Sequence, residues 1–439
     1  MSVERTRYTN LSQVSALALA AALGACGPAF ASGFGLNEGS ADWLGNAFAG
    51  GPAKAYDAST VWTNPAGMAL LDSSELDGNV SYIGPSATFT GSASNPYTGG
   101  NVSGVSGGNA VAPAASAAAF GVWTLAPNWR LGFSVTTPYG ERVSYPGDFV
   151  GRYQSFVSSI TDMNFGLALS YKVNDHFSVG GGPNIDYFNA NLSQALNTPL
   201  SELTGKDAIG DIYGDDVGVG YNLGALYKVD DTLRFGLDYR SRIRHNIKGG
   251  QHSTVPPIYA EYSPLLAAML NAANSHATTN ITLPDSVSFG VYDQVTPRLA
   301  LMASATWTEW SLFNSLVVTA TNGSGSSTLY ENWHNSWFAG LGANYQLTDK
   351  LMLQTGFSYD ESPVSNDNRT TRVPDADHYN LGIGAQYQLL PNTKLELAYL
   401  HLFSPGGKIN NSASASAGVI AGNYDDSDNS VTAGVTMKF

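Results

Sequence analysis

Few residues of the chain are spaced for catalysis or metal binding. Residues 104–108 read Gly-Val-Ser-Gly-Gly, the pattern of a nucleophile elbow, but their Gly/Ser/Asn-rich surroundings favour a loop over a strand-to-helix turn. The 7 His residues are dispersed, without metal-ligand spacing. Asp425, Asp426 and Asp428 fall in a predicted outer loop, where they could bind Ca²⁺, bridge lipopolysaccharide or form a solvated acidic face. We therefore predict no enzyme activity, cofactor or metal.

Four arginines at alternate positions are better placed to meet an acidic group. They are Arg234, Arg240, Arg242 and Arg244. Residues of equal parity share one face of a strand, so these side chains could point into the lumen of a barrel. Arginines in such a position often only balance acidic neighbours such as Asp238, and we favour that interpretation. Both interpretations require strands that close around a lumen.

The first residues of the chain resemble an export signal. Arg5 and Arg7 precede a short apolar run at residues 14–25, and residues 29–31 read Ala-Phe-Ala, which suits signal peptidase. We predict a cleaved signal peptide at residues 1–31. An acylated Cys26 is the alternative, because Leu-Gly-Ala precedes it as in a lipoprotein box.

The composition favours a transmembrane β-barrel. The 439 residues include 48 Gly and 23 Tyr, only 13% are charged, and the net charge is -14. An acidic chain argues against nucleic acid, which favours basic patches. No stretch after residue 31 reaches the roughly 18 apolar residues of a spanning helix. Barrel strands alternate lipid-facing and lumen-facing residues, so no single segment looks strongly hydrophobic.

Short turns give an expected number of strands. Asn, Asp and Pro, which suit tight turns, recur between alternating segments. These turns are residues 126–128, 173–175, 229–231, 295–297, 347–349 and 390–392. Long Gly/Ser/Asn-rich stretches separate them, as in outer-membrane barrels. Six periplasmic turns and two periplasmic termini leave seven outward hairpins, which predicts a closed antiparallel barrel of about 14 strands.

Alternation supports the expected strands. Leu351, Leu353 and Phe357 share one face of a predicted strand, and Gln354 lies on the other. The chain ends on Phe439, and a last strand with a terminal aromatic resembles the assembly signal of outer-membrane barrels. We therefore expect the barrel assembly machinery to be a partner.

The segment before the barrel lacks strand alternation. Residues 32–77 contain Trp43, Trp62 and several other large apolar side chains among many small residues. A linker rarely carries so many large apolar side chains. A barrel of 14 strands leaves a lumen, so we expect this segment to plug it.

An ordered set of motifs resembles the long-chain fatty acid transporter (FadL) family. The set comprises Ser-Gly-Phe-Gly-Leu-Asn-Glu at 32–38, Leu-Gly-Asn-Ala at 44–47, Asp-Ala at 57–58, Asn-Pro-Ala-Gly-Met at 64–68, Thr-Pro-Tyr-Gly at 137–140, Tyr-Arg-Ser at 239–241, Leu-Pro-Asp-Ser at 283–286, Trp-Thr-Glu-Trp-Ser at 307–311, Asp-Glu-Ser-Pro-Val at 360–364, Asn-Arg at 368–369 and Val-Pro-Asp at 373–375. The resemblance spans nearly the whole mature chain. It implies an all-β fold with an N-terminal hatch at 32–77 and a transmembrane β-barrel at 78–439.

The resemblance also implies where a ligand is captured. Family members have a low-affinity groove between two long outer loops, which fall here at about 191–216 and 245–280. The second loop carries apolar residues at helix-like spacing. These candidates are Tyr259, Tyr262, Leu265, Leu266 and Met269. They could capture a ligand or simply pack on the neighbouring loop.

The exit route implied by the resemblance is a gap beside a kinked third strand. That strand falls at 129–140, with Thr137, Pro138 and Gly140 as kink residues, since Pro withholds a ladder donor. Hatch residues along the path would be Phe34, Leu36, Asn64, Pro65 and Ala66, the last three facing the kink. A plain structural turn is the other interpretation of residues 64–66.

The headgroup site departs from the family. Positions where fatty-acid members carry Arg and Lys fall at Asn189 and His334, neither a fixed cation at neutral pH. Arg240, Arg242 and Lys408 are the other candidates. The departure puts an acidic headgroup in doubt, and a neutral lining would suit aromatic hydrocarbons equally.

We therefore predict a bacterial outer-membrane protein that transports hydrophobic molecules passively, long-chain fatty acids first, and acts as a monomer among outer-membrane lipid and lipopolysaccharide. The alternatives are uptake of aromatic hydrocarbons, a structural or adhesive barrel, and a membrane-embedded lipid hydrolase.

Overall fold

The computed structural model describes residues 33–95, 97–412 and 417–439. The expected signal peptide, with Cys26, lies outside the described residues. Within them, no helix is long and apolar enough to cross a membrane.

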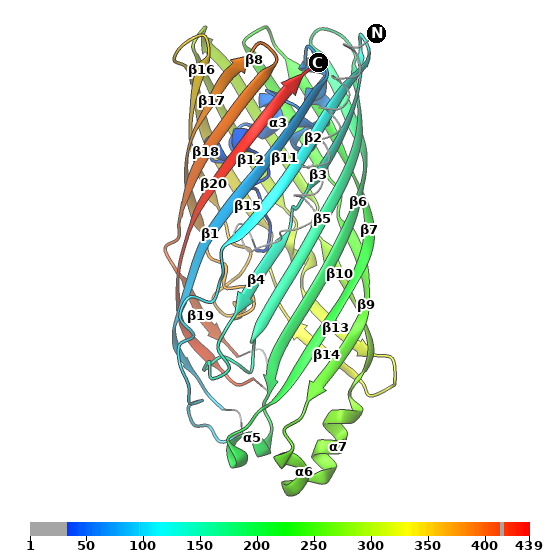
Figure 1. Ribbon diagram of the computed structural model, residues 1–439, viewed down its shortest axis with the longest axis vertical. Coiled ribbons are helices and arrows are strands. Elements are labelled where there is room, and N and C mark those ends of the chain that lie inside the picture. Colours follow the sequence, from blue (N-terminus) through cyan, green and yellow to red (C-terminus); the bar gives the residue numbers. More distant parts are fainter. Residues whose placement is uncertain (1–32, 96, 413–416) are drawn as a thin grey trace, which may run out of the picture.

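Twenty strand segments form one antiparallel sheet (Figure 1). They are β1 (Glu75–Ala93), β2 (Ala114–Ala126), β3 (Trp129–Thr136), β4 (Gly140–Ser144), β5 (Val157–Lys172), β6 (Phe177–Leu196), β7 (Ala208–Lys228), β8 (Leu233–Arg240), β9 (Ile243–Thr254), β10 (Ser275–Leu283), β11 (Ser286–Thr296), β12 (Leu299–Thr308), β13 (Ser315–Ala320), β14 (Ser326–Tyr330), β15 (Ser336–Gln346), β16 (Leu351–Asp360), β17 (His378–Leu390), β18 (Thr393–Phe403), β19 (Gly407–Asn411) and β20 (Ile420–Lys438).

The sheet closes into a barrel because its first and last strands pair. β1 pairs with β20 along its whole length, from Glu75↔Lys438 to Ala93↔Ile420. Six pairs of consecutive segments (β3/β4, β8/β9, β10/β11, β12/β13, β14/β15 and β18/β19) each continue one another along a single broken strand, so the barrel has 14 strands. The predicted fold and strand number are confirmed.

All six predicted turns join neighbouring strands at the end of the barrel that holds the C-terminus (Figure 1). Side chains close these turns. Asn174 Oδ1 accepts hydrogen bonds from the N–H groups of His176 and Phe177, at 2.8 and 2.9 Å. Asp230 Oδ1 accepts from the N–H groups of Thr232 and Leu233, at 2.8 and 2.9 Å. Such local bonds are the reason that Asn and Asp predict turns.

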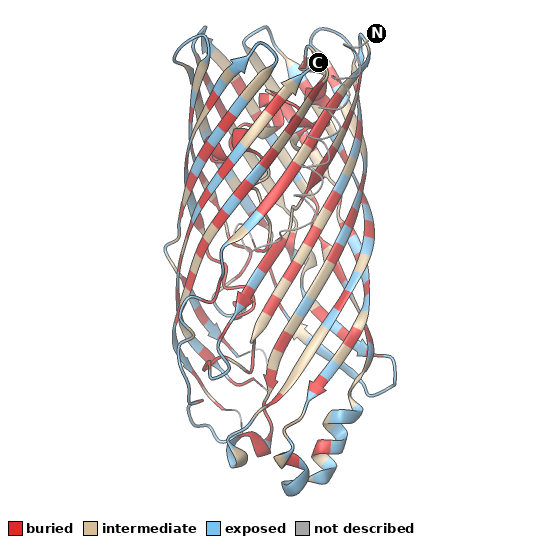
Figure 2. Ribbon diagram, in the orientation of Figure 1, coloured by how far each residue is buried: buried red, intermediate tan, exposed pale blue. Residues whose placement is uncertain are grey.

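The wall shows the expected alternation (Figure 2). In β16, Phe357 is 49% exposed, whereas Gln354 and Ser358 face the lumen and are buried. The outward face of the strands is apolar and the inward face is polar, as expected in a lipid bilayer.

The strands extend further outward than the sequence indicated. The connection after β6 comprises residues 197–207 and that after β9 comprises residues 255–274, both shorter than the predicted loops. Asp425, Asp426 and Asp428 lie within β20 and not in a loop, which corrects the expectation: Asp425 is exposed, whereas the other two are buried.

A hatch precedes β1 and lies inside the barrel (Figure 1). It contains α2 (Ala41–Gly45), α3 (Gly51–Lys54), α4 (Thr60–Thr63) and the 3₁₀ helix η1 (Pro65–Leu70). Ser40 and Asn64 cap α2 and η1, their side chains accepting from backbone N–H groups.

Wall glycines allow the hatch to approach the strands closely. A Cβ at Gly236 would lie 1.8 Å from the Pro52 carbonyl oxygen, and one at Gly356 would lie 2.0 Å from that of Asn46. The Gly-rich composition therefore makes room for the hatch at these positions.

Short helices also lie at the opposite end of the barrel. α5 (Pro199–Thr204), α6 (Ile258–Tyr262) and α7 (Pro264–Ala272) project beyond the strands at the end with the long loops (Figure 1). A short 3₁₀ helix, η2 (Trp310–Leu312), follows β12.

Candidate functional site

An apolar hollow, here called the outer cavity, lies in the barrel near the long loops. It holds about 740 Å³ of space, its mouth included. Inward-facing side chains of β5, β6, β9, β10 and β13 form most of its wall. They include Ile160, Phe188, Leu192, Ile247, Ile281 and Val318. These strands depart locally from the polar inward face, which leaves a surface for an apolar chain, at roughly 0.8 kcal/mol per buried CH₂.

Two charged side chains line the outer cavity. Glu331, between β14 and β15, and Arg372, between β16 and β17, are 5% and 6% exposed. Burial, opposed by Arg372 and Trp333, raises the pKa of Glu331 to about 7. Burial lowers the pKa of Arg372 to about 10, while Glu331 opposes that shift. Arg372 is thus charged at neutral pH, and Glu331 is close to half-protonated.

An aromatic plug closes the inner end of this cavity. The ring of Phe34 lies among four others, with centroid distances of 5.0 Å to Trp310, 5.6 Å to Trp333, 5.6 Å to Phe313 and 5.8 Å to Tyr139. Edge-on packing dominates, which is the favourable geometry for such rings. Phe34 comes from the hatch and the other rings from the wall and loops, so the plug joins the two.

Backbone contacts hold Phe34 in place. The Gly33 N–H donates to Asp375 Oδ2 at 2.9 Å, with Gly33 at φ 79°. A Cβ there would lie 2.4 Å from the Trp333 ring, so both conformation and space require glycine. The Gly140 N–H donates to the Phe34 carbonyl at 2.9 Å.

A second hollow, the inner cavity, lies between the hatch and the wall. It holds about 1190 Å³ and is more polar than the outer cavity. Arg240 and Asp238 of β8 border it. The guanidinium of Arg240 stacks 3.4 Å from the Trp62 ring and donates to the Trp62 carbonyl at 2.5 Å. Arg240 therefore attaches the hatch to the wall.

The ladder between the second and third strands is interrupted. It ends at Ala119↔Val135, and the two sides meet again at the isolated bridges Val111↔Val143 and Val105↔Phe149. We call the interruption between Ala119↔Val135 and Val111↔Val143 the wall opening. In the break between β3 and β4, the Pro138 carbonyl accepts from the Leu36 N–H at 2.8 Å. The hatch thus pairs with the kink where β2 does not.

A small side pocket of about 280 Å³ lies at the wall opening. Its lining includes Ser116 of β2 and Thr137 of the kink, whose hydroxyl oxygens are hydrogen-bonded at 2.7 Å across the interruption. Leu36, Trp43, Trp62 and Pro138 line both this pocket and the inner cavity. The inner cavity therefore extends to the barrel wall.

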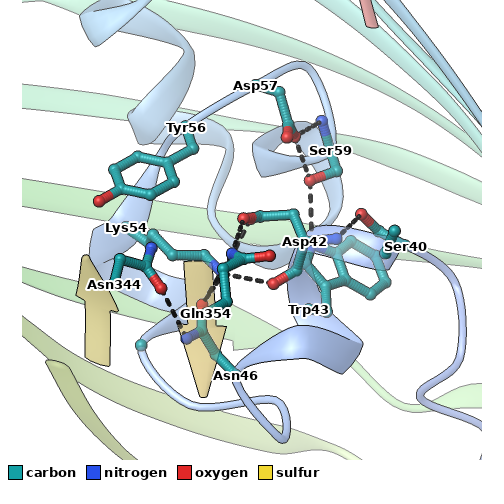
Figure 3. A network of polar contacts seen from close by, with 12 residues as sticks. Ser40, Asp42, Trp43, Asn46, Lys54, Tyr56, Asp57, Ser59, Asn344 and Gln354 are labelled. Atoms are coloured by element: carbon teal, nitrogen blue, oxygen red, sulfur yellow. Dashed lines mark hydrogen bonds and ion pairs between the residues drawn. The ribbon is translucent and has the colours of Figure 1, made fainter. Parts of the chain in front are cut away.

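A buried polar network fixes the rest of the hatch (Figure 3). Lys54 Nζ forms an ion pair with Asp42 at 2.8 Å and donates to Asn46 Oδ1 at 3.0 Å. Gln354 of β16 donates to Asp42 Oδ1 at 2.9 Å, and Asn46 donates to Asn344 of β15 at 2.7 Å. A buried pair of this kind is held in place by its additional hydrogen bonds.

A second ion pair joins the hatch to β18. Lys394 lies 3.2 Å from Asp57 and 2.8 Å from Glu396. Burial by itself would raise the pKa of Asp57, but Lys394, hydrogen bonds from Ser59, and Lys54 together hold it below its ordinary value. Asp57 therefore stays ionised and paired.

The expectation that residues 64–66 face the kink is wrong. Asn64 Nδ2 donates to the Ala225 carbonyl of β7 at 3.0 Å. A Cβ at Gly180 of β6 would lie 2.6 Å from the Pro65 carbonyl carbon, and the Ala66 carbonyl accepts from Ser178. This segment packs against β6 and β7, whereas Phe34 and Leu36 meet the kink residues.

Only one of the predicted headgroup residues borders a cavity. Asn189 is on β6 with parity opposite to the lining residue Phe188, and His334 and Lys408 are exposed. Arg242 forms ion pairs with Asp285 and with Glu309, the latter at 2.7 Å. Arg240 alone of this set lines the inner cavity.

The expected common face of the arginines is wrong beyond Arg240. β8 ends at Arg240 and β9 begins at Ile243, and this break changes the inward parity from even to odd. Arg244 is therefore exposed, whereas Arg234 points inward and its Nε donates to the Ala53 carbonyl at 2.7 Å. A bulge that shifts strand parity leaves no local sequence signal here.

The predicted capture residues on the loop helices differ in their burial. Tyr259 is fully buried, and its hydroxyl is hydrogen-bonded to Thr198 at 3.0 Å and donates to the Lys206 carbonyl at 2.9 Å. It joins the third and fourth outer loops, so for Tyr259 the structure favours packing on the neighbouring loop over capture of a ligand. Leu266 is half-buried against the same cluster.

Three other predicted capture residues are exposed and apolar. Tyr262 is 57% exposed, Leu265 is 73% and Met269 is 61%. Leu203 of α5 adds to this surface at 63%. We call these four residues the apolar tip, a surface of a kind that often marks a binding site.

The elbow-like sequence at 104–108 does not have an elbow's structure. It lies in the loop between β1 and β2, with Ser106 exposed. Among the described residues, no three His, Cys, Asp or Glu side chains are grouped to hold a metal ion.

Sequence reasoning missed the charged pair of the outer cavity. Glu331 and Arg372 lie in connections and reach the lumen only because those connections fold inward. The sequence feature nearest to Arg372 was the pair of family-like motifs on either side of it, Asn-Arg at 368–369 and Val-Pro-Asp at 373–375.

The comparisons with known proteins agree with this architecture. A family model described as outer membrane protein transport protein (OMPP1/FadL/TodX) matches residues 22–439. A long-chain fatty acid transport protein of Salmonella typhi is 28% identical over 424 residues, covering 93% of this chain and 94% of that protein. A 47 kDa outer membrane protein of Pasteurella multocida is 30% identical, covering 90% of this chain and 92% of that protein.

Solved structures show the same barrel. The crystal structure of a Pseudomonas aeruginosa FadL homologue superimposes with a TM-score of 0.86 at 25% identity, covering 93% of this chain and 100% of that one. The Ralstonia pickettii toluene transporter TbuX shares the fold, with a TM-score of 0.65 at 16% identity, covering 92% and 99% of the two chains. The chain is therefore an outer-membrane β-barrel that belongs to the outer membrane protein transport protein family (OMPP1/FadL/TodX).

Proposed function

We propose that this barrel carries hydrophobic molecules, long-chain fatty acids first, from the cell exterior into the outer membrane. The supporting observation is the succession of adjoining cavities: the outer cavity ends at the Phe34 plug, and the inner cavity beyond it shares the apolar residues Leu36, Trp43 and Pro138 with the side pocket. A ligand that follows this route leaves sideways through the wall opening.

Passive transfer between apolar surfaces has a clear physical basis. An alkyl chain gains roughly 0.8 kcal/mol per CH₂ when it leaves water, so a water-filled pore offers it nothing. Lateral release delivers the chain into lipid without exposing it to the periplasm. No nucleotide-binding motif is needed, because binding at each stage is driven by burial.

Capture begins at the apolar tip in this proposal. Leu265, Met269 and Tyr262 expose their side chains beyond the strands. The cluster beneath them, which includes Tyr259 and Leu200, holds the helices in a fixed place. A fatty acid released there is close to the mouth of the barrel.

The first test is uptake of labelled oleate and labelled toluene by cells that lack their own transporter. We expect oleate to enter faster than in empty-vector cells. Faster entry of toluene alone would move the cargo to aromatic hydrocarbons, which the largely uncharged lining of the outer cavity would also suit. If neither compound enters faster while the barrel is folded, the proposed function is wrong, and an adhesive or structural role is the better hypothesis.

The second test locks the wall opening. Ser116→Cys with Thr137→Cys would place two thiols where hydroxyl oxygens are now 2.7 Å apart. The chain's one Cys, Cys26, lies in the predicted signal peptide, so no other thiol competes. We expect uptake to fall on oxidation and to recover on reduction, because the disulfide spans the exit.

The matched control is Ser81→Cys with Thr432→Cys. Their hydroxyl oxygens are 2.8 Å apart on β1 and β20, which already pair continuously there. Oxidation should leave uptake in this variant unchanged. Equal uptake by oxidised and reduced Ser116/Thr137 variants would exclude lateral exit at this place.

We further propose that the chain works as a monomer surrounded by outer-membrane lipid and lipopolysaccharide, and that Phe439 is its contact with the barrel assembly machinery. Phe439 is 55% exposed, and its N–H donates to the Ser74 carbonyl at 3.0 Å. Phe439→Ala should lower the amount of folded barrel in the membrane. Phe403→Ala, which removes another exposed aromatic ring, is the control.

A further inference from the structure

The charged pair of the outer cavity is unusual because its members do not pair directly. Glu331 and Arg372 are both buried, carry opposite charges and line the same apolar space. Within the described part of the chain, the ion pairs within 4.0 Å do not include these two side chains. Two buried charges that do not contact each other directly can each meet a polar group of a ligand.

Atoms of the pair also lack hydrogen-bond partners. Arg372 donates through Nη2 to Gln194, but its Nη1 is buried and has no partner among the described residues. Among the described residues, Glu331 Oε2 and the hydroxyl of Thr279 are also buried without a hydrogen-bond partner. Thr279 lines the outer cavity as well. Unsatisfied buried donors and acceptors are costly, so a ligand that satisfies them gains affinity and specificity.

We propose that the outer cavity binds a carboxylic acid headgroup together with one proton, which the ligand carboxyl and Glu331 share while Arg372 donates to the other ligand oxygen. This inference rests on the proposed function and adds the protonation state of the cargo and the residues that select it. No covalent bond changes, and the proton comes from Glu331 or from solvent.

The charges favour a shared proton. A ligand carboxylate and an ionised Glu331 carry two negative charges against the single positive charge of Arg372. Glu141 of β4 is another buried carboxyl that interacts with both Glu331 and Arg372. One proton between the ligand and Glu331 makes those two carboxyls and Arg372 neutral together, which a poorly solvated cavity requires.

The unpartnered atoms of Arg372 and Glu331 also predict which ligand headgroups the site excludes. A headgroup that fits must accept from Arg372 Nη1 and share a proton with Glu331 Oε2. A carboxylic acid does both, and an alcohol does both without a charge. A methyl ester carries no charge and cannot donate. It leaves the charge of Arg372 unbalanced when Glu331 is protonated, and it leaves Glu331 Oε2 without a donor when Glu331 is ionised. Toluene has no headgroup and should not respond to changes at Glu331.

The test measures binding of labelled oleate, oleyl alcohol, methyl oleate and toluene to the full-length barrel in lipid nanodiscs between pH 6 and pH 8.5. Above the pKa of Glu331, about 7, each oleate must take up one proton on binding. The affinity of the unaltered protein for oleate should therefore fall by about ten-fold per pH unit relative to that of Glu331→Gln. Oleyl alcohol should lack this slope, and methyl oleate should bind more weakly than oleate at pH 6.

Controls separate this effect from the titration of oleate itself. Empty nanodiscs give the partitioning of oleate into lipid at each pH. Asp349→Asn makes the same acid-to-amide change at an exposed turn and should keep the slope. Arg372→Lys keeps the charge but changes the donor geometry, and it should weaken oleate without affecting toluene.

The outcomes are distinguishable from those of the proposed function. An identical slope in the unaltered protein and in Glu331→Gln, with both binding oleate, would overturn the shared proton and leave transport intact. Methyl oleate binding as tightly as oleate, or binding of toluene alone, would also overturn it. Failure of every compound to bind and to enter cells would instead overturn the proposed function.

Discussion

At the scale of single residues, the Phe34 ring lies where the two cavities meet, and we propose that it controls the passage between them. Its ring contacts Trp310, Trp333, Phe313 and Tyr139, so one hatch side chain completes a cluster built by distant segments. Because the kink and Asp375 hold the hatch backbone here, and the buried ion pairs of the hatch lie elsewhere, the plug can open by a local movement that leaves those ion pairs intact.

Phe34→Ala should join the two cavities. We expect faster uptake of the transported compound, together with a loss of about 3 kcal/mol of stability, because a buried aromatic ring is removed. Uptake by cells and unfolding of the purified barrel measure the two effects. Phe357→Ala, on the lipid-facing side of β16, is the control and should leave uptake unchanged. Unchanged uptake in the folded Phe34 variant would show that the plug is not the barrier.

Lys54 illustrates how burial changes the contribution of an ion pair to the stability of the fold. The Lys54–Asp42 pair is 3% and 2% exposed, whereas the Lys172–Asp175 pair is 38% and 89% exposed. Lys54→Met leaves Asp42 buried and unpaired, and should cost about 3–5 kcal/mol. Lys172→Met should cost about 1 kcal/mol or less. Urea unfolding of both variants checks the difference, and equal losses would contradict a locked hatch.

At the scale of elements, the apolar tip and the wall opening mark the two ends of the proposed route. The tip depends on α6 and α7, which Tyr259 anchors to the third outer loop. The opening depends on the break between β3 and β4, where the hatch takes the place of β2.

Replacing Leu265 and Met269 together by Asn should affect capture and not passage. Both side chains are mainly exposed, so the fold should tolerate the change. We expect the concentration for half-maximal oleate uptake to rise about 30-fold, with little change in the maximal rate, since two apolar contacts of about 1 kcal/mol each are lost. Initial uptake rates over a range of oleate concentrations provide the measurement. A fall in the maximal rate alone would place these residues in a later step.

At the scale of the whole molecule, the barrel encloses many carboxyl groups, so its stability should depend on pH. Glu38 of the hatch is 5% exposed, and burial, followed by repulsion from Asp428, raises its pKa to about 7 from 4.5. The folded protein therefore binds more protons than the unfolded chain between these values. The contribution of Glu38 to stability is complete below pH 4.5 and is lost as pH rises through 7.

Glu38→Gln removes that dependence. At pH 5 the variant and the unaltered protein should have similar stability, because Glu38 is largely protonated. At pH 8 the variant should be more stable by about 3 kcal/mol, the difference that such a change in pKa represents. Urea unfolding at the two pH values measures it, with Asp349→Asn as the exposed control. A stability difference that does not grow with pH would contradict the buried, protonated state of Glu38.

The sequence by itself determined the barrel, its 14 strands and the side on which the short turns lie. Those features follow from local chemistry: side chains alternate with a period of two, and residues such as Asn174 and Asp230 close turns with their own neighbours. The resemblance in the hatch and kink motifs also pointed to Phe34, Leu36 and Pro138, which do meet in space.

The tertiary structure alone decided which side chains reach the lumen. A parity change between Arg240 and Ile243 turned Arg244 outward, and inward-folded connections brought Glu331 and Arg372 into one cavity. Bulges and connections depend on contacts between residues that are far apart in the chain, so neither periodicity nor spacing reports them.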